Sequence, residues 1–153
     1  MAAHRWSKAL NLAGKSSLSR RFTRVHAELY RRTGGRFLPS WFGGPVMVIE
    51  VVGRRSGQVR RVPVIRVTHG DGYVVVPSNA GSDRTPAWWL NLRDAGEAWV
   101  VYRGRRRHVR PRVTEGVERQ RLWKRFAEVY PGLDDYATYT DREWPVVLLE
   151  PTE

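Results

Sequence analysis

Short apolar runs separated by turn residues dominate the pattern of this chain and predict a protein built mainly of strands. Residues 46–52 form a run of strand length that is apolar except for Glu50, and residues 59–68 form a second strand. His69-Gly70-Asp71-Gly72 then leads into a third strand over 73–76, because an Asp-Gly pair between apolar runs is typical of a tight hairpin. Further strands are predicted over 99–103, 107–113 and 146–149, the first two of them joined by a turn at Gly104.

Helical spacing of apolar residues predicts three helices among these strands. The first, over 18–30, has an apolar stripe with arginines on or beside its other face. The second begins with Thr85 as N-cap and Pro86 at the first helical position, and it ends at Gly96. The third begins at Thr114 and ends at Pro131-Gly132. Strands that follow one another without regular helical crossovers favour an antiparallel barrel decorated by helices, an α+β fold that is mainly β.

The charge balance indicates a polyanionic partner. The chain has 27 Lys and Arg against 15 Asp and Glu, a formal net charge of +12. Nucleic acid, an anionic membrane surface or a multiply charged small molecule would suit such a surface. The absence of cysteine excludes disulfides and thiolate chemistry, and the four scattered histidines lack the spacing of metal ligands, so no metal site is expected. No apolar run is long enough to span a membrane, and residues 1–14 lack the apolar core of a secretory signal, so a cytoplasmic location is expected.

A turn rich in arginine joins the first two strands of the predicted barrel. Gly53 and Gly57 frame Arg54, Arg55 and Ser56, and Arg60 and Arg61 begin the following strand. Guanidinium groups bind phosphate and carboxylate in bidentate fashion, and glycine lets the backbone approach an anion closely. The turn therefore predicts an anion clamp, although it lacks the Gly-Lys-Ser/Thr ending of a P-loop.

Two further segments carry candidate chemistry. Residues 76–92 run from a strand end through small polar residues into a helix that carries Trp88 and Trp89, of which one is expected in the core and the other beside a planar ring. Residues 130–139 hold three tyrosines around a Pro-Gly break and predict an aromatic lid with phenol donors, while simple core packing of Tyr130 is an equal alternative. Without a conventional catalytic set, any redox chemistry would belong to a cofactor.

In this order and spacing, Gly53-Arg54-Arg55-Ser56-Gly57 with Arg60, Ser78-Asn79-Ala80-Gly81, 86–92, Tyr130-Pro131 and Asp135-Tyr136 resemble the deazaflavin-dependent nitroreductase family. These are actinobacterial and archaeal proteins with a split β-barrel, related to the FMN-binding, pyridoxamine-phosphate-oxidase-like barrels. The resemblance covers about residues 44–151. It implies a division into an N-terminal basic amphipathic helical segment, 1–43, and a split β-barrel cofactor-binding domain, 44–153.

The resemblance implies coenzyme F420 as cofactor, a deazaflavin with a phosphate, a lactyl group and an oligoglutamate tail that would match the clamp. It also implies contacts of the acceptor with Tyr130, Leu133 and Tyr136, and hydrogen bonds from Ser78, Tyr130 or Tyr136 as the catalytic groups that stabilise developing oxyanion character. The implied cofactor-binding residues are Arg54, Arg55, Ser56, Arg60, Arg61, Val62, Pro63, Val64, Ile65, Val76, Pro77, Ser78, Asn79, Ala87, Trp88, Trp89, Leu90 and Asn91.

Two departures from the family pattern bear on these roles. The family often has Lys where Arg55 and Asn79 stand, so one contact loses its charge at Asn79. Members that reduce nitroimidazoles often carry a tyrosine where Leu133 stands, so slow turnover of such prodrugs is predicted.

The expected function is F420H2-dependent reduction, by hydride transfer, of a quinone, enone or nitro acceptor. An FMN-binding oxidoreductase of the same barrel type is one alternative. A basic membrane- or nucleic-acid-binding module without catalysis is another, and residues 103–108 would be its centre unless they form a solvated hairpin tip. The helix over 18–30 suits anionic lipid equally with packing on the barrel, so peripheral contact with the inner face of the cell membrane is a further expectation, whereas no nucleic-acid partner is expected.

Overall fold

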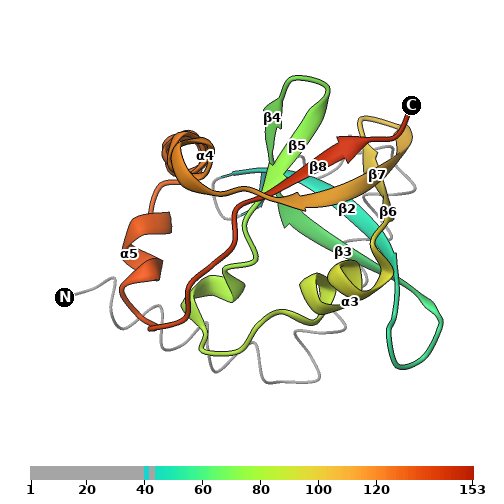
Figure 1. Ribbon diagram of the computed structural model, residues 1–153, viewed down its shortest axis with the longest axis horizontal. Helices are drawn as coiled ribbons and strands as arrows, with labels where there is room; N and C mark the ends of the chain where they lie inside the picture. The colour runs from blue at the N-terminus through green and yellow to red at the C-terminus, as the bar shows by residue number, and fades with distance from the viewer. Residues whose placement is uncertain (1–39, 42–43) are drawn as a thin grey trace.

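A computed structural model describes residues 40–41 and 44–153 of the chain, and the predicted helix over 18–30 lies outside them (Figure 1). The strands are β1 Ser40–Trp41, β2 Gly44–Val52, β3 Val59–Ile65, β4 Val67–His69, β5 Gly72–Val75, β6 Ala98–Tyr102, β7 Arg105–Val113 and β8 Val147–Pro151. The helices are α3 Ala87–Ala95, α4 Gly116–Val129 and α5 Leu133–Ala137, and a short 3-10 turn, η1, covers Asn79–Gly81.

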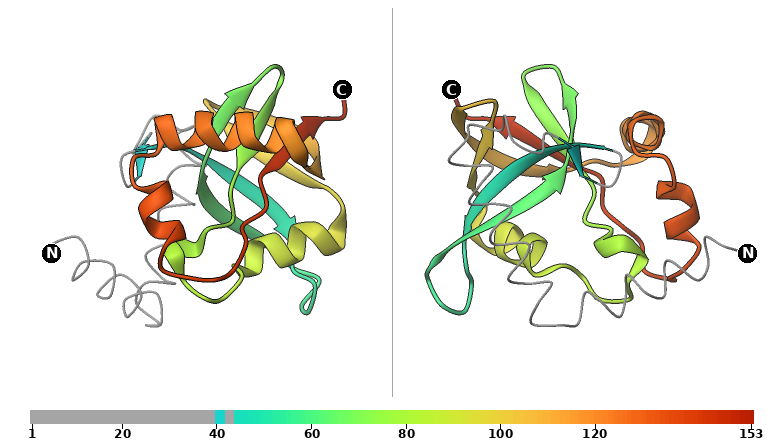
Figure 2. Two further views of the ribbon diagram at one scale, coloured as in Figure 1. Left: turned by 60° about the vertical axis from the view of Figure 1, so that its left-hand side comes forward. Right: turned by 180° about the vertical axis from the view of Figure 1, so that it is seen from behind.

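The strands form one curled antiparallel sheet. Their order is β1-β2-β6-β7-β8-β5-β4, and β3 pairs with β2. The strands β3 and β4 are consecutive in the chain, yet they pair with strands far apart in this order, so the sheet must curl to bring its ends together. The result is a half-barrel whose helices lie to its sides (Figures 1 and 2).

The predicted strand over 59–68 is two strands, because the chain bends at Arg66. The Arg66 amide still donates to the Pro45 carbonyl at 2.9 Å, in register with the β2–β3 ladder, and from Val67 onward the chain pairs with β5 instead of β2. The Arg66 side chain is only 7% exposed, and its guanidinium carbon lies 3.7 Å from the centre of the Tyr102 ring. A favourable cation–π contact thus offsets part of the cost of burying this charge.

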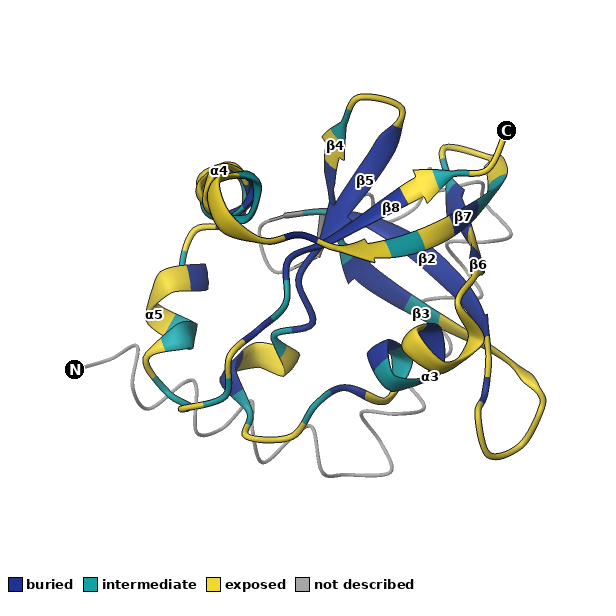
Figure 3. Cartoon of the chain, viewed as in Figure 1, coloured by how far each residue is buried: buried dark blue, intermediate teal, exposed yellow. Residues whose placement is uncertain are grey.

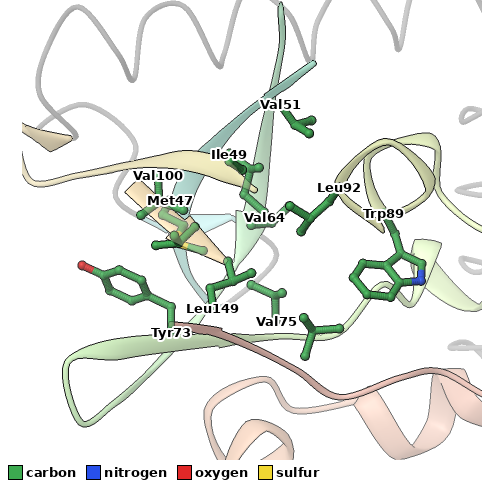
Figure 4. Packing of buried hydrophobic residues seen from close by; sticks show 13 residues of the cluster. Met47, Ile49, Val51, Val64, Tyr73, Val75, Trp89, Leu92, Val100 and Leu149 are labelled. Atoms are coloured by element: carbon green, nitrogen blue, oxygen red, sulfur yellow. The ribbon is translucent and has the colours of Figure 1, made fainter. Parts of the chain in front are cut away.

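The first of two large core clusters lies between the sheet and α3. Alternate residues of β2, Met47, Ile49 and Val51, point to this cluster, as do Trp89 and Leu92 of the helix (Figure 4). Burying each such side chain contributes about 1.5–3 kcal/mol. The apolar face of α3 therefore fixes the helix against β2, close to the arginine-rich turn.

The second cluster holds α4 and α5 against the other side of the sheet. Val74 of β5 and Leu148 of β8 meet Phe126, Tyr130 and Leu133 there. Neighbouring residues of β5 point to opposite clusters, so this strand is buried on both faces (Figure 3). The continuous apolar pattern of β5 follows from this double burial.

The structure shifts two predicted helix starts. Pro86, rather than Thr85, is the N-cap of α3, and the helix begins at Ala87. Glu115 is the N-cap of α4, whereas Thr114 is buried and its hydroxyl donates to the Val146 carbonyl at 2.9 Å. A threonine that the sequence predicts as a helix N-cap thus makes its side-chain hydrogen bond to the residue before β8 instead. No helix in the described ranges, 40–41 and 44–153, is long and apolar enough to cross a membrane.

Candidate cofactor and acceptor site

Close packing shapes the arginine-rich turn between β2 and β3. The Gly53 amide donates to the Gln58 carbonyl and the Gly57 amide to the Gly53 carbonyl, both at 2.8 Å. A Cβ atom at Gly53 would lie 2.8 Å from the Ser56 Oγ and 3.4 Å from the Arg60 Nε. Glycine at this position therefore lets Ser56 and Arg60 close over the backbone, where Arg60 Nη2 donates to Ser56 Oγ at 3.2 Å.

Asn91 of α3 holds Arg54 in place. Its Oδ1 accepts a hydrogen bond from the Arg54 amide at 3.2 Å and another from Arg54 Nη1 at 3.0 Å. The Asn91 side chain is 7% exposed, so the helix supplies a fixed anchor for an otherwise exposed turn. The predicted cofactor residue Asn91 thus positions a second predicted cofactor residue.

Within the part of the chain that the structure describes, the guanidinium groups of the turn lack carboxylate partners. Among the described residues, Arg54, Arg55 and Arg60 take part in no ion pair, and all three are exposed. Elsewhere Arg112 pairs with Glu118 and Glu150 at 2.8 and 2.7 Å. Uncompensated cations gathered on one turn are suited to an anionic ligand.

The predicted contact segment 60–65 divides between two faces of the sheet. Val62 and Val64 pack on the first cluster, and Arg60 shares their side of β3 by strand alternation. Arg61 lies on the other side, where its Nε is 3.0 Å from Glu50 Oε1, and Pro63 alternates with it. The structure therefore brings Arg60 together with Arg54 and Ser56 but leaves Arg61 apart from them.

Glu50 is the centre of that outer face. It is 6% exposed and also receives Arg106 Nε at 2.8 Å on its second carboxylate oxygen. Burial opposes ionisation of Glu50, but the hydrogen bonds from Arg106 and Arg61 outweigh it and hold its pKa below the usual value.

The basic run 103–108 forms an exposed turn at Arg103-Gly104, as the hairpin-tip alternative predicts. Within this run, Arg106 is paired with Glu50.

The loop after β5 has an unusual backbone. Asn79, Ala80 and Gly81 all have positive φ, at 49°, 52° and 76°. Asn79 is stabilised there by its side chain, whose Nδ2 donates to the Arg84 carbonyl at 2.9 Å. Ala80 has no such compensation, and a non-glycine residue in this region costs about 1–3 kcal/mol. Strain of this kind concentrates at ligand-binding sites, so it supports the predicted role of the loop.

Arg142 binds the backbone of this loop through its side chain. Nothing in the sequence had marked it as a residue of the site. Its guanidinium donates to the carbonyls of Pro77, Ser78 and Ser82, the shortest of these bonds being 2.9 Å to Ser78. The partners are main-chain atoms 60 to 65 residues away in the sequence. No sequence motif marks such a contact.

One of the two tryptophans of α3 is buried in the core, as predicted, while contact of the other with a planar ring stays a prediction. Trp89 is buried in the first cluster, whereas Trp88 is half-buried at its edge, with the two ring centres 6.4 Å apart. Leu90 is half-buried and Ala87 exposed on the same helix, while Val76 and Pro77 are buried at the end of β5. Trp88 is therefore the indole that keeps part of its surface exposed at the edge of the first cluster.

Stacked tyrosines form the aromatic wall. The rings of Tyr130 and Tyr136 stack with centres 6.0 Å apart, and Tyr139 meets Tyr136 edge-on. A Cβ at Gly81 would lie 2.9 Å from the Tyr136 carbonyl, so the wall adjoins the strained loop. Burial, and then the neighbouring Tyr136 phenol, raise the pKa of Tyr130 well above its usual value.

Leu133 is buried in the core, whereas Tyr136 of the aromatic wall is partly exposed. The Leu133 side chain is 0% exposed and belongs to the second core cluster. Sequence reasoning gave no sign that residues 133–137 form a helix, α5, which turns Leu133 inward and leaves Tyr136 half-buried. The predicted acceptor contact at Leu133 therefore finds no support in its position.

Known proteins provide an independent comparison. The model of the family described as F420H(2)-dependent quinone reductase matches residues 22–151. Rv3178 of Mycobacterium tuberculosis, whose name carries the same enzyme class, is 32% identical over 107 residues, which are 70% of this chain and 90% of the relative. "F420H(2)-dependent quinone reductase Rv1261c" of the same organism is 28% identical over 130 residues, 82% of this chain and 87% of the relative.

Two solved structures are also similar to this chain. The structure of an F420-H2-dependent reductase, FDR-A, has a TM-score of 0.64 and 33% identity, covering 69% of this chain and 94% of that one. The haem storage protein HutZ of Vibrio cholerae, with a TM-score of 0.50 and 10% identity, covers 83% of this chain and 91% of its own, and it is similar in fold alone.

These comparisons confirm the split-barrel fold, the enzyme class of F420-dependent reductases and coenzyme F420 as the cofactor, with FMN remaining only an alternative. The family match begins at residue 22, and the predicted division at residue 44 stays a prediction. The chain belongs to the F420H2-dependent quinone reductase family.

Proposed function

We propose that this protein reduces a quinone with F420H2, and that the turn carrying Arg54, Arg55 and Arg60 binds the anionic tail of the cofactor. The charge of these three guanidiniums carries the proposal: no carboxylate within residues 40–41 and 44–153 pairs with it, and the carboxylates and phosphate of the cofactor would supply such partners. Ser56 and Asn91 hold two of them in place.

The deazaflavin ring is proposed to lie between the turn and the strained loop. Trp88 offers a half-buried indole at the edge of the first cluster, and Val62 packs on the same cluster from β3. In this proposal Ser78 and Asn79 contact the ring system from the loop. The cofactor supplies the hydride, while these residues hold it against the acceptor and exclude water.

The aromatic wall is proposed to receive the acceptor. A quinone that gains hydride develops oxyanion character, which a neutral phenol or hydroxyl stabilises by donating a hydrogen bond. Tyr136 is half-buried and stacks on buried Tyr130, so Tyr136 is the proposed contact and Tyr130 its support. Enones and nitro compounds develop similar charge, and they remain secondary candidates.

The arrangement of Tyr130 predicts a specific dependence on pH. Because its pKa is raised in the folded state, the free energy of unfolding should lose the contribution of the neutral phenol as pH rises through about 10, where the unfolded phenol ionises. The difference in stability between wild type and Tyr130→Phe should stay constant from about pH 7 to about pH 9 and shrink above about pH 10. Urea unfolding of both proteins measures it, and a difference that changes near neutral pH would contradict the assignment.

Asn91→Ala is expected to weaken F420 binding by about three- to tenfold, because Arg54 loses both hydrogen bonds to the helix at about 1 kcal/mol each. Asn91→Asp keeps the acceptor oxygen but pairs Arg54 internally, so it should weaken binding at least as much. Fluorescence titration with F420 measures both variants. If Asn91→Asp bound F420 more tightly than wild type, Arg54 would not contact the cofactor.

The cofactor assignment itself is tested by titrating the protein with oxidised F420 and with FMN side by side. Saturable binding of F420, with FMN weaker, is expected. Oxidation of F420H2 in the presence of menadione then tests the acceptor. Failure of both cofactors to bind would remove the proposed function.

Peripheral membrane contact through residues 1–39 remains a proposal, since these residues lie outside those the structure describes. The basic amphipathic pattern over 18–30 supports it. Sedimentation with phosphatidylglycerol vesicles is expected to carry the full chain down at low salt, while phosphatidylcholine vesicles should leave it in solution.

A further inference from the structure

The guanidinium of Arg142 binds backbone carbonyls at both ends of the loop 77–82. Its Nη1 donates to the Pro77 carbonyl at 3.1 Å, and its Nη2 donates to Ser78 at 2.9 Å and to Ser82 at 3.2 Å. The Nε donates to the Ser82 carbonyl as well, at 3.3 Å. Hydrogen bonds from a charged donor are about twice as strong as neutral ones. The guanidinium therefore satisfies backbone carbonyls of the loop, as hydrogen bonds from a neighbouring strand would do in a sheet.

The planarity of the peptide bond fixes the direction in which the backbone amides of this loop point. In a trans peptide the C=O and the N–H point in opposite directions, and the described residues contain no cis peptide. With the Ser78 and Ser82 carbonyls drawn towards Arg142, the amides of Asn79 and Asp83 point away from it. Neither amide donates to another atom within residues 40–41 and 44–153. Two donors thus remain on the far side of the loop.

The strain of the loop requires an external constraint. Asn79 and Ala80 hold positive φ, and Ala80 gains nothing locally that offsets its cost. Such a conformation persists only where surrounding structure over-determines it. Arg142 supplies four hydrogen bonds to the loop, and the Tyr136 carbonyl lies so close to Gly81 that a Cβ there would be 2.9 Å from it.

We propose that Arg142 is a positioning residue of the cofactor site, which presets the strained loop and turns the Asn79 and Asp83 amides towards the ligand before it binds. This inference rests on the proposed function for the identity of the ligand, but not for the state of the loop.

Three variants test the proposal. Arg142→Gln keeps hydrogen-bonding capacity without charge, and Arg142→Lys keeps the charge but not the planar fork. Arg119→Gln is the matched control, because Arg119 Nη2 donates to the Trp144 carbonyl at 2.7 Å, two residues from Arg142, without contacting the loop. Amide exchange of Gly81 and Ser82, whose N–H groups bond to Ser78 and Asn79, reports the loop in cofactor-free protein.

In Arg142→Gln we expect exchange at Gly81 and Ser82 to accelerate at least about tenfold and F420 to bind at least about tenfold more weakly. Arg142→Lys should recover part of both effects, and Arg119→Gln should change neither by more than about twofold. Unchanged exchange and affinity in Arg142→Gln would overturn the proposal, as would equal effects in Arg119→Gln. If wild type failed to bind F420, the proposed function would fall, and the exchange data would still decide whether Arg142 presets the loop.

Discussion

Arg54→Ala combined with Arg55→Ala is expected to weaken F420 binding by about ten- to a hundredfold while leaving the fold intact. A hydrogen bond to a charged group contributes about 1.5–3 kcal/mol, and exposure to solvent reduces that figure for both arginines. Both side chains are exposed, so their truncation removes little buried surface. Fluorescence titration gives the affinity, and thermal unfolding checks the fold.

The control for this result removes the same charge elsewhere. Arg105 and Arg110 are exposed on β7, and their double replacement by alanine lowers the net charge equally. That control should bind F420 within about twofold of wild type, and added salt should weaken binding in wild type more than in the Arg54/Arg55 variant. If both double variants lost the same affinity, the effect would come from overall charge rather than from a clamp.

Local chemistry explains why the arginine-rich turn stands out in the sequence as a candidate clamp. Glycines, arginines and a serine lie within a few residues of one another, and a hairpin turn keeps neighbours in sequence together in space. Arg61 shows where that reasoning stops. Its neighbour Arg60 differs from it only in the face of β3 that it occupies, and the face depends on the register Glu50↔Arg61 with β2. Register is a tertiary property, so the contact segment 60–65 could not be divided from the sequence.

Long-range contacts explain the features that were missed. The predicted strand 59–68 divides at Arg66 because its first part pairs with β2 and its second with β5, and the choice of partner is set by the sheet as a whole. Thr114 resembles a helix cap but bonds to Val146. In the same way, Arg142 acts through main-chain carbonyls, which carry no residue-type signal at all. Residue type predicts a partner only where that partner is a side chain close by.

Leu133→Tyr provides the sharpest test of which residues face the acceptor. The resemblance to nitroimidazole-reducing relatives places this position in the substrate wall, whereas the structure buries the leucine completely in the second core cluster. Tyrosine there would overpack the core at about 1–3 kcal/mol and bury a hydroxyl that costs about 1–3 kcal/mol more if unpaired. Urea unfolding should therefore show a loss of about 2–5 kcal/mol, with acceptor turnover reduced rather than raised.

Leu133→Met is the matched control for this variant, because it conserves volume and should cost less than about 1.5 kcal/mol. Its turnover of quinone should stay close to that of wild type, since Tyr130 and Tyr136 keep the stack that the core residue supports. F420 affinity should hold in both variants, because the clamp lies against α3 and not against α5. A Leu133→Tyr protein as stable as wild type, with faster reduction of nitroimidazoles, would instead place this side chain against the substrate and require α5 to open when the acceptor binds.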